Sequence, residues 1–124
     1  MILVFVEDGT LEIVEGLEEA RRNYEGIDVE SGVYEFYDEK GIYLKPIFTK
    51  PNKINKLFWL FSSIVSGEYI LEPAPNEGED IITALKETIA LTDNRWFKNL
   101  DEVKKFLTSA STSTSGTLAR PSAS

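Results

Sequence analysis

The clearest alternation of apolar and polar positions lies in residues 31–50, SGVYEFYDEKGIYLKPIFTK. Asp38-Glu39-Lys40-Gly41 has the chemistry of a type I turn in which glycine takes the position that needs positive φ. A three-residue loop of this kind places Asp38 opposite Ile42 and puts alternate side chains on two faces of a hairpin. The cross-strand pairs would be Phe36 with Leu44, Tyr37 with Tyr43, and Glu35 with Lys45. The pattern therefore predicts an antiparallel hairpin with a fixed register.

Shorter patterns predict the other elements. Residues 2–6 and 10–14 are typical of strands joined by a two-residue Asp8-Gly9 turn, which would bury Val4, Val6, Leu11 and Ile13 on one face. Apolar spacing predicts helices near 17–25, 81–91 and 99–107, the last capped by Asn99, and a strand at 68–72. We expect one α+β domain in the order ββαββ, a segment of uncertain type, β, αα. Its mostly antiparallel sheet would have about five strands, with the helices packed on one face.

The pattern of residues 54–65 is compatible with either a helix or a β-strand. Their apolar positions have helical spacing, which would turn Trp59 away from the core among polar neighbours. The same aromatic residues and isoleucines suit a β-strand, which allows Trp59 to be buried. The pattern alone favours a helix only slightly.

The composition changes at residue 109. Residues 109–124 are almost entirely Ser, Thr and Ala and contain no aromatic side chain. Such a segment buries too little apolar surface to offset its conformational entropy. We therefore expect a globular domain over residues 1–108 and a disordered tail over 109–124.

Composition narrows the possible chemistry. The 124 residues carry a net charge of −8 and contain neither cysteine nor histidine. Disulfides, thiolate nucleophiles, histidine bases and the usual transition-metal ligands are therefore excluded. No catalytic or phosphate-binding motif is present, so we expect a protein that is not an enzyme and has no cofactor or metal. Three places are rich in acidic residues, and local structure accounts for each. Glu77, Glu79 and Asp80 suit the start of a helix. The pairs Glu7–Asp8 and Asp38–Glu39 suit turns.

The charge is unevenly distributed. Residues 45–66 contain four lysines and no acid, so this segment carries +4. Because the whole chain carries −8, the remaining residues carry a net −12. Lysines interleaved with aromatic residues could anchor a protein interface, lie on an anionic membrane or stack on nucleic acid bases. The interface candidates are Trp59, Phe58, Lys53, Lys56, Lys50 and Lys45. A core position for the aromatic residues, with solvated lysines, is the plainest interpretation of the same pattern.

These patterns predict a non-enzymatic, acidic binding domain that acts through a protein–protein interface, for example as an inhibitor or antitoxin of a basic partner. A first alternative is a small-molecule binder or carboxylate-dependent enzyme that uses Tyr37 and Tyr43 on the sheet. A second is peripheral membrane attachment through residues 53–65. The acidic balance disfavours nucleic acid. The start MILVFVEDG has no basic stretch before its apolar residues, so a cytoplasmic location is expected.

Overall fold

The structure, a computed structural model, describes the backbone of residues 1–58 and 61–118, and the side chains of residues 1–53 and 65–109. Its strands and helices form one α+β domain, which confirms the expected class. In chain order the elements are β1 (Ile2–Val6), β2 (Thr10–Val14), α1 (Leu17–Asn23), α2 (Gly26–Glu30), β3 (Tyr34–Asp38), β4 (Tyr43–Lys50), β5 (Lys53–Phe58), β6 (Phe61–Val65), β7 (Glu68–Pro73), α3 (Ile81–Lys86), β8 (Ala90–Leu91) and α4 (Leu100–Leu118).

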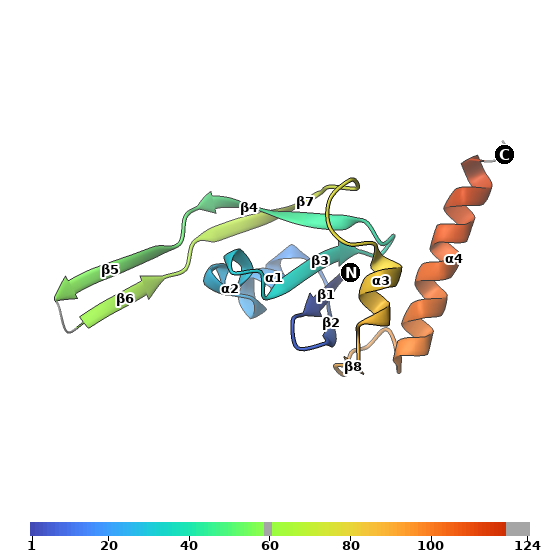
Figure 1. Cartoon of the computed structure of the whole chain (residues 1–124), viewed down its shortest axis with the longest axis horizontal. Coiled ribbons are helices and arrows are strands. Elements are labelled where there is room, and N and C mark those ends of the chain that lie inside the picture. Colours follow the sequence, from blue (N-terminus) through green and yellow to red (C-terminus); the bar gives the residue numbers. More distant parts are fainter. Residues whose placement is uncertain (59–60, 119–124) are drawn as a thin grey trace.

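The described strands form a six-stranded sheet in the order β7-β4-β3-β1-β2-β8 and a separate two-stranded ribbon, β5-β6. All neighbours in the sheet are antiparallel except β2 and β8. In Figure 1 the ribbon continues the β4–β7 pair outward beyond the end of the sheet, and α4 lies at the opposite end of the molecule.

Helices cover both faces of the sheet, so the expectation of one covered face was wrong. Leu3 and Phe5 of β1 belong to a core with residues of α3 and α4, whereas Ile2 and Val4 belong to a core with residues of α1 and α2. Leu3 and Val4 are both 0% exposed. A central strand that is buried on both faces has an apolar residue at every position instead of at alternate ones. The sequence of β1, ILVFV, has this pattern.

The first hairpin has a three-residue loop, so the register expected from a two-residue loop was also wrong. Phe5 pairs with Leu11 and Val4 with Glu12, and Gly9 has φ 94° and donates its N–H to the carbonyl of Val6. The one-residue shift places Leu11 and Ile13 in the α3/α4 core and Val4 in the other.

The central hairpin has the predicted register. Phe36 pairs with Leu44 and Tyr37 with Tyr43, and the N–H of Asp38 donates to the carbonyl of Ile42 at 2.9 Å. Gly41 takes the expected positive φ of 85°.

The ladder between β3 and β4 is short because of Pro46. The Asp38–Ile42 pair is hydrogen-bonded, so the even-numbered positions of β4 direct their amide nitrogens toward β3. Pro46 has no N–H to donate there. The described pairing with β3 ends at Leu44, while β4 goes on pairing with β7 through Lys50.

Residues 53–65 contain the strands β5 and β6, so the slight preference for a helix was wrong. Backbone pairing joins Ile54 to Ile64 and Lys56 to Ser62, with an irregularity before Phe58. The long β4–β7 pair provides the template that this segment continues.

The final helix begins after its predicted cap. The side chain of Asn99 accepts a hydrogen bond from the N–H of Glu102 at 3.0 Å. Helix α4 runs through Leu118, and the last residues of the chain lie outside those described. Disorder after residue 108 stays a prediction, because it is a property of an ensemble of conformations.

The root of the ribbon is closely packed. A Cβ added at Gly67 would lie 2.0 Å from the carbonyl oxygen of Lys50 and 2.7 Å from the carbonyl carbon of Pro51. Both neighbours are backbone atoms, so neither can move aside by a rotamer change. This position therefore admits only glycine without a shift of the chain.

We predict that Gly67→Ala lowers the free energy of unfolding by about 1–3 kcal/mol, the usual range for an inserted methyl group in a packed site. The matched control is Gly16→Ala, because a Cβ there has no atom within 4 Å; at this N-cap position alanine is less favourable than glycine and should cost about 0.5–1 kcal/mol. Urea unfolding monitored by circular dichroism measures both. Equal stability of the two variants would contradict the packing seen at Gly67.

Candidate functional site

The structure distributes the six interface candidates along one continuous pair of strands. Lys45 and Lys50 lie on β4, and Lys53, Lys56 and Phe58 lie on β5. Trp59 lies outside the described residues. The lysines therefore follow the chain from the sheet into the ribbon, instead of gathering on one helix face.

Asn52 fixes the joint between the sheet and the ribbon. Its Nδ2 donates to the carbonyl of Gly26 at 3.0 Å and to Oε1 of Glu30 at 2.9 Å, and its Oδ1 accepts from the N–H of Gly67 at 2.6 Å. One side chain thus connects α2 with the last residue before β7. Asn52 therefore braces the base of the ribbon.

Two of the candidate lysines are engaged by the domain itself. Lys45 forms an ion pair with Glu77 at 3.1 Å, and Lys50 forms one with Glu68, also at 3.1 Å. The hydrogen bond and charge of Lys50 lower the pKa of the Glu68 carboxyl. Exposed pairs of this kind contribute little stability. Lys45 and Lys50 thus belong to the sheet, and Lys53 and Lys56 are the candidate lysines that lie on the ribbon itself.

The two candidate tyrosines have different environments. Tyr37 is 1% exposed, and its hydroxyl donates to the carbonyl of Glu79 at 2.5 Å. Burial raises the pKa of Tyr37, so this hydroxyl stays protonated and holds the loop before α3 on the sheet. Tyr43 packs against it edge-on, with ring centroids 5.7 Å apart. Tyr43 is half-buried and lines a pocket.

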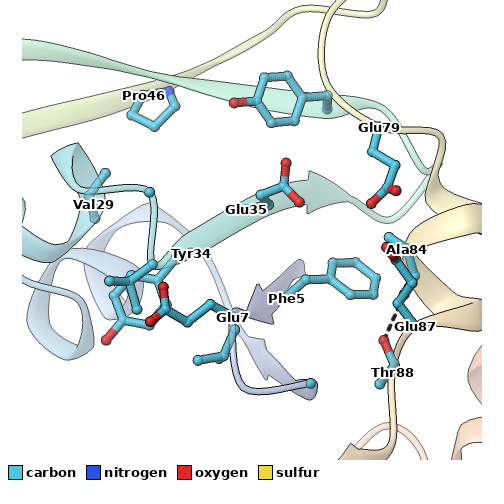
Figure 2. A pocket seen from close by; sticks show the side chains of 15 residues that line it. Phe5, Glu7, Val29, Tyr34, Glu35, Pro46, Glu79, Ala84, Glu87 and Thr88 are labelled. Atoms are coloured by element: carbon cyan, nitrogen blue, oxygen red, sulfur yellow. Dashed lines mark hydrogen bonds between the residues drawn. The ribbon is translucent and has the colours of Figure 1, made fainter.

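This pocket, of about 460 Å³, opens on the α3 face of the sheet where β3 and β4 separate. Phe5, Glu35, Tyr43 and Pro46 come from the sheet, and Ala84, Glu87 and Thr88 come from the end of α3. Figure 2 shows Glu35 between Pro46 and Phe5, with Glu79 and Glu87 on the wall toward α3. Pro46 ends the β3–β4 ladder beside this opening, so the shortened pairing and the pocket have one local cause.

Sequence reasoning placed Glu35 on the same face as Tyr37 and Tyr43 but did not identify it as part of a site. The expected ion pair with Lys45 concealed its role, because a partly buried glutamate requires either a basic partner or a cavity. The expected cross-strand partner, Lys45, instead pairs with Glu77.

The other acidic groups mostly have the local roles expected of them. Asp8 accepts from the N–H of Thr10, Asp38 accepts from the N–H groups of Lys40 and Ile42, and Asp80 caps α3. Among the described residues, no three acidic side chains are grouped closely enough to hold a metal ion. Glu7 and Glu79 differ from the rest, because both line the pocket.

Comparisons of the chain with protein-family models, with curated proteins and with solved structures find no match. Within residues 1–58 and 61–118, none of the helices combines the length and the apolarity that crossing a membrane requires.

We predict that Glu79→Gln stabilises the protein at neutral pH. Partial burial raises the pKa of the Glu79 carboxyl, and the hydrogen bond and charge of Glu87 raise it further, with smaller contributions from Glu35 and Asp80. An acid with a raised pKa in the folded state destabilises that state as pH rises above the ordinary carboxyl value. The melting temperature of the variant should therefore exceed that of the wild type by more at about pH 7 than at about pH 4.

The control for this experiment is Glu18→Gln, which removes the same charge from an exposed position at the start of α1. It should show no such increase with pH. A stability difference for Glu79→Gln that is constant from acid to neutral pH would contradict the raised pKa.

Proposed function

We propose that this chain is a non-enzymatic binding domain of the cytoplasm that holds a protein partner through the β5–β6 ribbon. The observation that carries the proposal is the position of the ribbon, which extends past the end of the sheet; within residues 1–58 and 61–118, no helix or strand is laid over it (Figure 1). At its base, Val65 is 49% exposed and its paired residue Lys53 is also exposed.

The ribbon is too small to be stable without help. A two-stranded hairpin is only marginally stable in water, because it has no second layer against which to bury apolar side chains. Yet β5 and β6 are rich in such residues: Ile54, Leu57, Phe58, Phe61, Ile64 and Val65. Each square ångström of apolar surface that a partner removes from water contributes about 25 cal/mol. A partner that covers the ribbon would therefore supply the missing layer.

The charges indicate what kind of surface would cover it. Residues 45–66 carry only positive charge, whereas the remainder of the chain carries a net −12. A groove that combines apolar residues with carboxylates would complement the ribbon and would be repelled by the acidic body, which fixes the orientation of docking. The outer strand edges could add backbone hydrogen bonds to an extended segment of the partner.

We predict that the double substitution Lys53→Glu and Lys56→Glu reduces capture of ribbon-dependent partners by at least about tenfold, equivalent to about 1.4 kcal/mol. The bait would be immobilised wild-type protein in native lysate at low ionic strength, with captured proteins quantified by mass spectrometry. The matched control is Lys104→Glu with Lys105→Glu, two exposed lysines of α4, which changes the net charge equally.

The outcomes separate the alternatives. An inhibitor or antitoxin that attracts a basic partner through the acidic body would retain its partner in the ribbon variant, and this result would contradict the ribbon proposal. Flotation of the wild type with anionic vesicles, lost in the ribbon variant, would assign the ribbon to a membrane surface instead. Loss of capture in both charge-reversed variants would show a dependence on net charge alone.

A further inference from the structure

Glu35 is a charged residue in an apolar setting. It lies on the face of β3 that carries Tyr37, and it pairs across the sheet with Phe5 of β1. Its side chain is half-buried. In the part of the chain that the structure describes, ion pairs are formed by other acids, namely Glu15, Glu39, Glu68 and Glu77. A carboxylate drawn partly out of water without a basic partner is costly unless something else binds it.

The same pocket collects three more carboxylates from separate parts of the chain. Glu7 follows β1, Glu79 precedes α3, and Glu87 follows α3. No lysine or arginine is found among the described residues that line the pocket. In Figure 2 the carboxylate of Glu35 lies on the side of Glu79 and Glu87, whereas that of Glu7 lies apart from all three. Negative charge is therefore present on two sides of the cavity.

Between these carboxylates the lining is apolar. Phe5 comes from β1, and Tyr43 and Pro46 come from β4, on the other side of β3. Val29 comes from α2 and Ala84 from α3. A volume of about 460 Å³ lies within the range of pockets that hold small organic molecules. Apolar walls suit methylene groups, and tyrosine rings suit a cation lying against their faces.

We propose that this pocket binds a primary alkylammonium chain, of the kind found in aliphatic diamines and polyamines. The ammonium groups would be held by the separated glutamates through charge-assisted hydrogen bonds, and the intervening methylenes would lie on Phe5, Tyr43 and Pro46. Separated charges joined by an apolar spacer match the layout of the pocket, in which the carboxylates stand on different walls.

The electrostatics of the pocket supports this assignment. The charge of Glu35 contributes to raising the pKa values of Tyr37, Tyr43 and Glu79, which indicates that its negative field reaches several walls of the pocket. A bound cation would relieve this repulsion as well as form new contacts. Binding should therefore also raise the melting temperature of the protein.

The test is isothermal titration calorimetry of the full chain with spermidine at low ionic strength. We expect saturable binding with defined stoichiometry and a tighter affinity than for Mg²⁺ or tetramethylammonium. Glu35→Gln keeps the shape and removes the charge, and it should weaken spermidine binding by at least about tenfold, the value of one charge-assisted hydrogen bond. Glu18→Gln, the charge-matched control on α1, should leave the affinity within about twofold.

A second titration identifies the source of the alkylammonium group. A short peptide with one lysine, blocked at both ends, presents the same group as a protein side chain. Tighter binding of spermidine assigns the pocket to free polyamines, and tighter binding of the peptide assigns it to a lysine of a partner protein. Both results would support the alkylammonium site.

Three results would overturn the proposal. These are no measurable binding of either probe, equal affinity for spermidine and Mg²⁺, and unchanged affinity in Glu35→Gln with circular dichroism showing a folded variant. The inference is independent of the proposed function of the ribbon. The Lys53→Glu and Lys56→Glu variant should bind spermidine at least as well as the wild type, so the two proposals can fail separately.

Discussion

The burial of β1 on both faces is the constraint on which the remaining structure depends. Leu3 and Val4 are adjacent and fully buried, so each face of the sheet needs its own cover. The chain supplies helices on both sides, α1 and α2 on one and α3 and α4 on the other. The α1/α2 core extends to Leu44 of β4 and Tyr69 of β7, whereas on the α3 face Tyr43 of β4 is only half-buried. The uncovered part of the α3 face is where the acidic pocket opens, and the strands beyond it extend into the ribbon.

The sequence predicted the register of a hairpin correctly where the residues of its turn specify the loop length. Asp38 to Gly41 determined the central hairpin correctly, because loop length and alternation agreed there. At Asp8-Gly9 the dipeptide indicated a turn but not its length, and the unbroken apolar run of β1 offered no alternation with which to choose the register. The apolar positions of residues 53–65 fit both the helical and the strand period. Their strand structure continues the pairing of β4 with β7, the two strands that flank this segment.

The candidate sites also divide into residues that the sequence could identify and residues that it could not. The lysines and Tyr43 could be selected from composition and spacing, since each stands out within its own segment. The glutamates of the pocket could not, because Glu7, Glu35 and Glu87 meet only after β1 pairs with β3 and α3 packs on the sheet. A proline such as Pro46 is by its chemistry a position without a ladder donor. Its consequence, an opening between β3 and β4, required knowing that its nitrogen faces β3.

The ribbon and the pocket have opposite charge, and β4 leads from one to the other, which raises the question of how one could influence the other. Electrostatic influence through solvent is weak, because charges are screened within about 8 Å at physiological ionic strength. A mechanical route is shorter: Pro46 lines the pocket, and four residues later Lys50 closes the pairing of β4 with β7. From there the side chain of Asn52 connects α2, the root of β5 and Gly67. Because α2 also contributes Val29 to the pocket wall, a ligand that shifts α2 would act on the base of the ribbon through that one amide.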